Sequence, residues 1–404
     1  MPVGFNANGI FYDTYNPSQL RKQSFADSLL RNFPNGTAPL LALIGEINKK
    51  KAVSTEHGYF TKTMAFVKPV INNSGGYVAG DTTLTVTSTE GVVSGTLFEV
   101  PSTREIIRVT ADPSSATSIT VARAQGRIAA AAIPNSTELM QIGNAHARAS
   151  SRPTARTFRT DYIANYTSIV RNAWALSETD RNSMANAGWE NVAESEADAA
   201  LLHSADIEAQ MWWGQAMAPT GTPPRHTTQG IIDAIYQYAP SNVLTAGSTT
   251  NYSQLMAMME PMFKFTSNLG EPTFRVIFCD SVAMRVFQDI GRYMGTLQQV
   301  MGESNNSFGV QYTKFRTYKG VVAIKEHPLF NSLRTANGLA VVTDLPTINV
   351  AYLGDRNAKP EQYELGKNAN GQDAIGGSFT SEFAMEVTSP ITCGIIKGLT
   401  AGVA

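Results

Sequence analysis

Residues of the types that form a hydrolase triad occur together in the segment His203-Ser204-Ala205-Asp206. In such a triad the histidine takes a proton from the serine while the carboxylate orients the imidazole. The surrounding segment is rich in Ala and Glu, which favour a helix. Neighbouring residues on a helix point in different directions, so these side chains cannot form a proton relay by themselves. We therefore expect no catalytic site here.

The sequence contains none of the common motifs for binding phosphate, dinucleotides or catalytic zinc, and no nucleophile elbow. The other histidines are isolated and lack the spacing of metal ligands: His57, His146, His226 and His327. Cys279 and Cys393 lie in apolar, strand-like stretches, so we expect buried thiols rather than a disulfide. These residues predict a protein that is not an enzyme and that holds neither a metal ion nor a cofactor.

Two apolar clusters could form binding surfaces. Trp212-Trp213 could stack against a sugar or a base. An adaptable binding face could form from the methionines Met256, Met258, Met259 and Met262. At helical spacing such residues more often fill a core, and we favour core packing for both clusters.

Charged residues are distributed unevenly along the chain. No acidic residue lies between Glu138 and Asp161, a stretch that includes Arg156 and Arg159. No Lys or Arg lies between Arg181 and Arg225, a stretch that includes the acidic residues Glu190 and Glu194. One interpretation is that both stretches are solvated faces. The alternative is that Arg156 and Arg159 of one copy contact Glu190 and Glu194 of another, because complementary charges fix the geometry of an interface.

The composition favours a protein in which large parts of the surface are covered by other molecules. The 404 residues are 43% hydrophobic and only 16% charged, whereas about a quarter of the residues in a typical globular protein are charged. The net charge of -1 disfavours tight nucleic-acid binding, which requires several basic side chains against phosphates. The N-terminus does not have the pattern of a signal peptide, and no apolar run is long enough to span a bilayer.

The elements that position these residues fall into several regions. Residues 1–51 predict an extended arm with one short helix near residues 25–33. Residues 56–70 and 156–166 predict a long antiparallel ribbon, interrupted by a block of short strands at residues 72–147 that predicts a small barrel or sandwich. Residues 186–217 predict one long helix, and an α+β pattern follows to the C-terminus.

Within that α+β pattern, helices are expected at residues 230–238, 252–269 and 281–292. Strands are expected at residues 273–278, 310–317, 321–325, 339–343, 348–353 and 378–387.

Several segments are similar to a known protein family: residues 25–36 with Ala38-Pro39-Leu40, residues 57–64, residues 318–324 followed by His327-Pro328-Leu329-Phe330, and residues 341–345. The order of parts also resembles that of the Hong Kong 97-like major capsid proteins of tailed bacteriophages. The sequence is most similar to a family typified by short-tailed phages. The resemblance spans nearly the whole chain.

This resemblance implies an α+β, Hong Kong 97-like capsid fold with an inserted all-β domain. The implied regions are an N-terminal arm (1–52), an E-loop ribbon (53–71 and 148–168), the inserted β domain (72–147), a P-domain (169–225) with the spine helix at 186–217, a mainly A-domain region with parts returning to the P-domain (226–376), and a C-terminal strand region (377–404).

The resemblance also implies a function and partners. The chain is expected to form hexamers and pentamers of an icosahedral shell around phage double-stranded DNA, without binding a specific DNA sequence. Its expected partners are further copies of itself, a portal protein at one vertex, and scaffolding and decoration proteins, but no membrane. It is expected in the virion, after assembly in the host bacterial cytoplasm. The alternative is an encapsulin-like shell, which has the same fold but packages enzymes; those chains are usually shorter and lack the insert.

Overall fold

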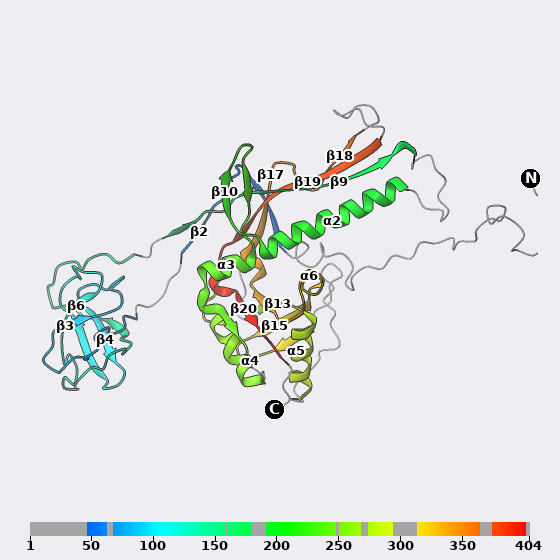
Figure 1. Cartoon of the computed structure of the whole chain (residues 1–404). Coiled ribbons are helices and arrows are strands. Elements are labelled where there is room, and N and C mark those ends of the chain that lie inside the picture. The colour runs from blue at the N-terminus through cyan, green and yellow to red at the C-terminus, as the bar shows by residue number, and fades with distance from the viewer. Residues whose placement is uncertain are drawn as a thin grey trace, which may run out of the picture. The chain divides into compact units, whose positions relative to one another are not determined.

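The computed structural model describes residues 47–62, 68–157, 160–179, 191–247, 250–267, 274–293, 313–363 and 374–400. The chain divides into two compact units, one formed by residues 1–59 and 164–404 and the other by residues 60–163. Figure 1 shows the helices and strands of both units. The helix expected near residues 25–33 lies outside the described residues, as do Arg159 and Glu190.

A five-stranded sheet in the first unit is organised around one long strand. Its strands are β1 (Asn48–Ala52), β9 (Ser168–Ser177), β17 (Ile348–Leu353), β18 (Lys359–Tyr363) and β19 (Ala374–Val387). β19 pairs antiparallel with β9, β18 and β17, and β1 adds a parallel edge strand to β17. Because side chains alternate along a strand, Phe383, Met385 and Val387 enter the core while Glu382 and Glu386 take the opposite face.

A six-stranded sheet in the same unit is buried on both faces. Its strands are β12 (Val243–Thr245), β13 (Phe274–Cys279), β14 (Thr313–Arg316), β15 (Val321–Glu326), β16 (Ala340–Thr343) and β20 (Gly394–Lys397). Val276 and Phe278 belong to one hydrophobic cluster, and Ile277 and Cys279 belong to another. Burial on both faces explains why β13 is a continuous apolar run apart from Arg275.

Helices cover these sheets. They are α2 (Asn191–Trp213), α3 (Ile231–Tyr238), α4 (Tyr252–Met259), α5 (Ser281–Tyr293) and α6 (Pro328–Ser332), with short 3-10 helices η4 (Pro240–Asn242), η5 (Glu260–Phe263), η6 (Leu345–Thr347) and η7 (Pro390–Thr392). α2 runs beside β9 and β19 (Figure 1) and is about 35 Å long at 1.5 Å per residue.

Two predicted helices end earlier than expected. α2 ends at Trp213 and not at Met217, because Gly214 and Gly230 approach each other closely; a Cβ atom on Gly214 would lie 2.5 Å from the carbonyl oxygen of Thr228. The helix expected at residues 252–269 stops at Met259, since Pro261 cannot donate the next helical hydrogen bond. The following chain forms η5 instead.

The predicted ribbon pairs as expected but over short strands. β2 (Tyr59–Thr61) pairs with β8 (Asp161–Ile163), and an antiparallel bridge joins Glu56 to Tyr166. A separate two-stranded hairpin follows α2 and consists of β10 (Met217–Thr220) and β11 (Arg225–Thr227). Sequence analysis did not predict this hairpin.

The second unit contains a five-stranded sheet in the order β3-β6-β5-β4-β7. The strands are β3 (Thr83–Thr85), β4 (Thr96–Val100), β5 (Glu105–Val109), β6 (Ser118–Ala122) and β7 (Met140–Asn144). The first four confirm the strands predicted in this block, and β7 was not predicted. Alternate residues of β4 and β5, such as Phe98 and Ile107, form this unit's own hydrophobic core.

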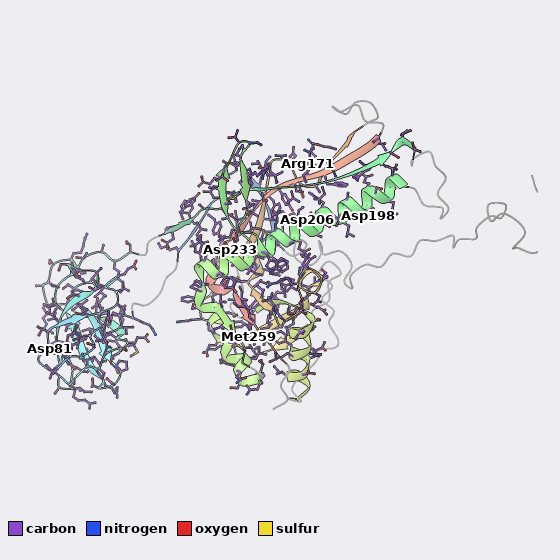
Figure 2. All side chains as sticks on the ribbon, viewed as in Figure 1. Asp81, Arg171, Asp198, Asp206, Asp233 and Met259 are labelled. Atoms are coloured by element: carbon purple, nitrogen blue, oxygen red, sulfur yellow. The ribbon has the colours of Figure 1, made fainter. Side chains whose placement is uncertain are left out.

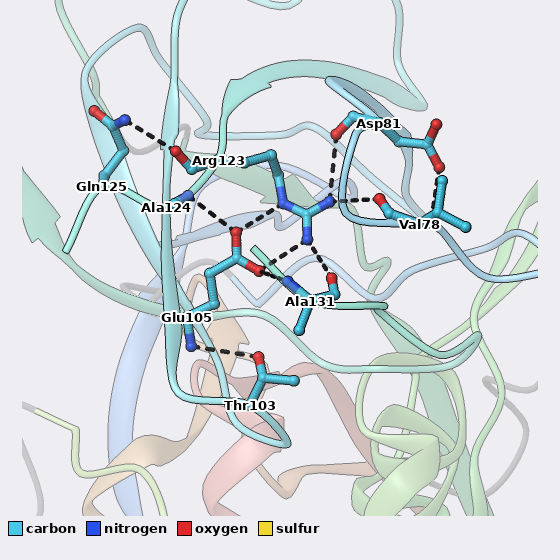
Figure 3. Close-up of polar contacts among 8 residues, drawn as sticks. All are labelled: Val78, Asp81, Thr103, Glu105, Arg123, Ala124, Gln125 and Ala131. Atoms are coloured by element: carbon cyan, nitrogen blue, oxygen red, sulfur yellow. Dashed lines mark hydrogen bonds and ion pairs between the residues drawn. The ribbon is translucent and has the colours of Figure 1, made fainter. Parts of the chain in front are cut away.

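A buried ion pair joins several segments of this unit (Figure 3). Arg123 donates from Nε and Nη2 to the two carboxylate oxygens of Glu105, each at 2.8 Å. Arg123 Nη1 also donates to the carbonyl oxygen of Val78 at 3.0 Å. Glu105 accepts from the backbone amides of Ala124 and Ala131. Burial raises the pKa of Glu105, but these hydrogen bonds outweigh it and leave the pKa below its usual value.

Candidate functional site

The contact predicted between copies involves residues in both units. Arg156 lies in the unit of residues 60–163, where its Nη2 atom donates to Gln141 Oε1 at 3.3 Å. Glu194 lies in the first turn of α2, in the other unit. Arg159 and Glu190 lie outside the described residues. The contact between copies therefore stays a prediction.

The residues of triad type on α2 do not form a relay with one another. His203 and Ser204 are buried, whereas Asp206 is exposed. Ser204 Oγ donates to the carbonyl oxygen of Leu201 at 2.7 Å. Asp206 instead accepts from Asn172 Nδ2 at 2.7 Å. This confirms that neighbours in sequence on this helix face different partners.

His203 instead joins α2 to two strands. Its Nε2 atom lies 2.8 Å from Ser381 Oγ on β19, and its Nδ1 atom lies 2.9 Å from Asn172 Oδ1 on β9. The backbone amide of Ala358 donates to Ser381 Oγ. Burial lowers the pKa of His203 and so favours its neutral ring. Ser381 is fully buried, so the arrangement positions elements and exposes no nucleophile to a substrate.

Glu386 on β19 joins three other segments of the first unit. Its carboxylate accepts from Lys50 Nζ on β1 at 2.6 Å and from Asn349 Nδ2 on β17 at 2.9 Å. His57 Nε2 lies 2.7 Å from its other oxygen. Burial raises the pKa of Glu386, but the hydrogen bonds from His57 and Lys50 outweigh burial and lower it to about 2. The carboxylate is therefore ionised at neutral pH.

Both strands at the base of the ribbon are fixed to β19. His57 binds Glu386, as described above. On the returning strand, Asn165 Nδ2 donates to the carbonyl oxygen of Met385 at 2.7 Å, and Thr167 Oγ1 donates to Glu382 Oε1 at 2.9 Å. Glu382 also forms an ion pair with Arg356. We call His57, Asn165 and Thr167 the ribbon base. Its contacts hold the chain where the ribbon leaves the first unit.

A second buried pair joins α2 to the six-stranded sheet. His327 Nε2 lies 2.7 Å from Glu208 Oε1 and 3.0 Å from Trp212 Nε1. Burial, together with the nearby charge of Lys325, lowers the pKa of His327 to about 3. The backbone amide of Leu329 donates to His327 Nδ1 at the start of α6. His327 thus links α2, β15 and α6, which sequence analysis did not predict for an isolated histidine.

The two apolar clusters pack as predicted. Trp212 is fully buried against Phe278 and Phe330, with ring centroids 5.2 and 5.0 Å apart. Met256, Met259 and Met262 are buried in a core cluster that Met258 also contacts. Cys279 and Cys393 are buried free thiols, as expected. Neither cluster forms a surface that could receive a ligand.

Two exposed aromatic residues, Phe60 and Tyr162, lie on the ribbon. The rings of Phe60 on β2 and Tyr162 on β8 are in contact, with centroids 5.2 Å apart. Phe60 is 69% exposed and Tyr162 is 51% exposed. Two strands have too few neighbours to bury such rings on their own. The two rings therefore leave apolar area exposed in the described part of the chain.

Within the described part of the chain, no group of three or more His, Cys, Asp or Glu side chains is arranged to hold a metal ion. Among the same residues, no helix is both long and apolar enough to cross a membrane.

The sequence itself indicates that β19 makes buried polar contacts. Glu382 and Glu386 flank a buried apolar stretch of β19, formed by Phe383, Ala384 and Met385. A carboxylate within a buried strand requires a partner, because an unpaired buried charge is strongly destabilising. This rule predicts that such residues have partners, but it cannot say that the partners are Lys50, His57 and Arg356.

Comparison with known proteins identifies the family. The family model for the SU10 major capsid protein matches residues 7–400 of the chain. The chain belongs to this family. The major capsid protein of Pseudomonas phage PaMx41 is 42% identical over 405 residues, which cover 97% of this chain and 96% of that protein. The chain is accordingly a phage major capsid protein and a component of the virion. Its family is one of structural proteins and not a class of enzymes.

Solved structures show the same fold. The capsid chain of cyanophage A-1(L) has a TM-score of 0.53 at 9% identity, and the match covers 96% of this chain and 100% of that chain. At this identity the likeness concerns the fold alone, a mixture of helices and strands. The encapsulin of Synechococcus elongatus matches 61% of this chain and 81% of its own length, with a TM-score of 0.39. That likeness is too distant to support the encapsulin-like alternative.

Proposed function

We propose that this chain assembles as hexamers and pentamers into an icosahedral shell that encloses phage double-stranded DNA. The observation that carries the proposal is the family match over residues 7–400, supported by a relative of nearly equal length. The exposed aromatic pair of the ribbon fits this role, because subunits of a closed shell cover such surfaces with one another.

We assign Hong Kong 97-like regions to the described elements. β2 and β8 belong to the E-loop (53–71 and 148–168), α2 is the spine helix of the P-domain (169–225), and the six-stranded sheet with α4 and α5 belongs to the A-domain (226–376). Residues 1–52 form the N-terminal arm and residues 377–404 the C-terminal strand region. The ribbon base supports this assignment, since it fixes both strands of the E-loop to β19.

We assign the inserted β domain (72–147) to the outer face of the shell, where it contacts a neighbouring subunit or a decoration protein. Its support is a hydrophobic core of its own, which includes Leu84, Phe98 and Ile119. A segment with its own core can project from a shell without being stabilised by it.

Other partners follow from the role of a shell that packages DNA. These are a portal protein at one vertex, a scaffolding protein during assembly, and DNA held without recognition of its sequence. Assembly takes place in the host bacterial cytoplasm, a reducing compartment in which the buried free thiols of Cys279 and Cys393 fit. Burial raises the pKa of both thiols, so they stay protonated and unreactive.

The purified protein tests this function directly. Negative-stain electron microscopy should show shells or ring-shaped capsomers, and particles from infected cells should contain double-stranded DNA and a portal protein. Particles that contain an enzyme and no DNA would instead support the encapsulin-like alternative. A compact monomer that persists at high concentration, under conditions that permit assembly, would contradict both.

A further inference from the structure

The sheet of the second unit has side chains on both faces (Figure 2), and apolar residues lie on the face turned away from its core. On β4 and β5 alternate residues, such as Phe98 and Ile107, fill the core. Because side chains alternate along a strand, Leu97 and Ile106 take the opposite face, and neither belongs to the core cluster. An antiparallel sheet with one solvated face usually has polar residues at such positions.

Exposed apolar residues of β7 extend this face. Met140 lies opposite Glu99 in the strand register and is 45% exposed. Ile142, at the register shift between β7 and β4, is 42% exposed. Together with Leu97 and Ile106, these residues place large apolar side chains on three neighbouring strands. Apolar area of this kind on the surface of a domain indicates a site that another molecule covers.

Four residues of β4 and β5 form a square with two kinds of diagonal. The strand register pairs Leu97 with Arg108 and Glu99 with Ile106. Adjacent strands are about 4.8 Å apart, and residues two positions apart on one strand are about 6.8 Å apart. One diagonal is therefore apolar, from Leu97 to Ile106, and the other is charged, from Glu99 to Arg108. We call these four residues the β4-β5 square.

The two charged corners of the square each have a contact within the domain. Arg104 Nε lies 3.7 Å from Glu99 Oε1, and the side chain of Arg104 is 76% exposed. Arg108 Nε donates to Gln125 Oε1 at 3.2 Å, also at the surface. Exposed contacts of this kind contribute little to stability. They can therefore be kept or exchanged when either charged residue meets a second partner.

We propose that the β4-β5 square of one copy packs on the square of a second copy, about a twofold axis that runs along the apolar diagonal. Rotation about this axis places Glu99 of one copy over Arg108 of the other, and Arg108 over Glu99. Leu97 and Ile106 lie on the axis, and each faces the same residue of the second copy. The surface complements itself, as a contact between two identical faces requires.

The residues beside the square fit the same rotation. Met140 lies beside Glu99 on β7, and Ala122 lies beside Arg108 on β6. The rotation that places Glu99 over Arg108 also places Met140 over Ala122, where a small side chain leaves room for a large one. Side chains interdigitate in this way when two sheets pack face to face.

The inference rests on the proposed function, which gives the inserted domain either a neighbouring subunit or a decoration protein as its partner. The charged diagonal favours a second copy of the same domain. A single rotation satisfies both of its charges and both apolar corners, and complementary charges fix the geometry of such a contact. A decoration protein or a solvated face would each give a different result in the experiments below.

Chemical crosslinking tests the position of the axis. Leu97→Cys places a thiol on the axis, so a short bismaleimide should join two copies of this variant into covalent dimers in assembled particles. Ile106→Cys lies on the same axis and serves as a second reporter. The native thiols of Cys279 and Cys393 are buried and should not react. Thr120→Cys is the matched control, because this exposed position on β6 would lie on the order of 20 Å from its own copy and should give no dimer.

Charge variants of the Leu97→Cys protein give a readout that only a self-complementary contact produces. Glu99→Lys brings like charges together at both ends of the contact, and so does Arg108→Glu. Each variant alone should lower the yield of crosslinked dimers on the order of fivefold at low salt. An equal mixture of the two should recover the yield, because each copy then meets the opposite charge at both ends. Arg148→Glu changes the net charge as Arg108→Glu does, at an exposed position outside the sheet, and should leave the yield unchanged.

The outcomes separate this inference from the proposed function. Circular dichroism and thermal unfolding of the subunits should show that every variant folds. If a charge variant alone forms no particles, the yield of particles from the mixture replaces the yield of dimers as the measurement. If the unmodified protein forms no particles, the proposed function fails. If particles form but neither reporter gives a dimer, or the mixture recovers nothing, this inference alone is overturned. A crosslink from either reporter to a different protein, in particles from infected cells, would overturn it in favour of a decoration protein.

Discussion

Single buried carboxylates join segments that are far apart in the sequence. Asp280 is an example outside β19: its Oδ2 atom accepts from the backbone amides of Asn337, Gly338 and Leu339 at 2.8 to 3.0 Å. Its Oδ1 atom accepts from the backbone amide of Ala283 in the first turn of α5. Gly338 has a φ of +76° and no room for a Cβ atom, which would meet Leu399. One side chain thus fixes both a helix start and a loop.

The substitution Glu386→Gln should weaken the joint between β1, the ribbon base and β17. A neutral amide keeps the shape but loses the charge-assisted hydrogen bonds to Lys50 and His57. The free energy of unfolding should fall by about 1–3 kcal/mol, measured by urea denaturation of unassembled subunits. Glu361→Gln is the matched control, because its pair with Arg171 is about half exposed and should contribute less than about 1 kcal/mol.

The stability of the unmodified protein and that of Glu386→Gln should depend differently on pH. The pKa of Glu386 is about 2 in the folded protein, below its ordinary value of 4.5, so the ionised carboxylate stabilises the fold. This contribution is fully present above pH 4.5 and is lost as the pH falls toward about 2. Stability of Glu386→Gln should therefore fall less steeply across this range than that of the unmodified protein. Identical slopes would show that Glu386 is not held as an ion pair.

Charge reversal also tests the contact predicted from the sequence between the ribbon and α2. Arg156→Glu with Arg159→Glu, or Glu190→Arg with Glu194→Arg, should hinder shell formation and leave the subunit folded. Like charges across an interface cost a few kcal/mol where water is excluded and less than about 1 kcal/mol where it is not. Shell yield is the measurement, and all four changes together should recover assembly. Equal yields for every variant would mean that both stretches are ordinary solvated faces.

At the scale of elements, the end of α2 depends on two glycines. Gly214→Ala would place a Cβ atom 2.5 Å from the carbonyl oxygen of Thr228 and 2.6 Å from that of Gln210. The overlap should lower the free energy of unfolding by about 1–3 kcal/mol, measured by thermal or urea denaturation. Gly80→Ala is the control, since no atom lies within 4 Å of its Cβ position, and it should change stability by less than about 0.5 kcal/mol. If Gly214→Ala left the free energy of unfolding unchanged, α2 could continue past Trp213.

Elements with strong patterns could be predicted from the sequence, and those that depend on distant partners could not. β13 and α5 were predicted almost to the residue, because an apolar run and an amphipathic helix are local signals. β9 was missed although its burial alternates, and β1 was missed because it is exposed except at Ala52. β1 forms as an exposed edge strand because it pairs with the edge of β17. No local pattern in the sequence of β1 indicates this distant partner.

The residues of the candidate site show the same contrast between local patterns, which could be predicted, and distant partners, which could not. Core packing of Trp212 and the methionines followed from residue type and spacing. The partners of His203 and His327 did not, because they lie more than a hundred residues away on Ser381 and Glu208. Along α2, Ile207 and Met211 are buried, whereas Ala193 and Ala197 are exposed. Small residues satisfy a helical pattern equally well on a covered and on an open face.

The inserted domain should fold as an isolated fragment. A fragment of residues 72–147 should be soluble and show a β-type circular dichroism spectrum. The structure indicates a better boundary at residue 69, because Ile71 is buried in this unit's core and its backbone bonds with Thr137 and Ser136. The fragment that keeps Ile71 should be more stable by about 2–4 kcal/mol in thermal or urea unfolding. A disordered spectrum for both fragments would contradict an independent domain.

At the scale of the whole molecule, assembly should cover the aromatic pair on the ribbon. Phe60→Ser with Tyr162→Ser should leave the stability of the free subunit within about 1 kcal/mol, because both rings are already exposed. The same variant should assemble poorly, since the rings lose apolar area that a neighbour would bury. Leu333→Ser, which is exposed outside the ribbon, is the control. Normal shells from the double variant would show that the pair stays in solvent.

The pairing of β2 with β8 has a consequence for how such chains diversify. The chain enters the unit of residues 60–163 on one strand and leaves it on the strand hydrogen-bonded to the first. A domain whose two ends lie side by side can be exchanged for a short turn or for a foreign domain with adjacent termini, while the host chain keeps its path. This position is therefore a natural graft point, where an antigen or an affinity tag could replace residues 72–147 and be displayed in as many copies as the assembly has subunits.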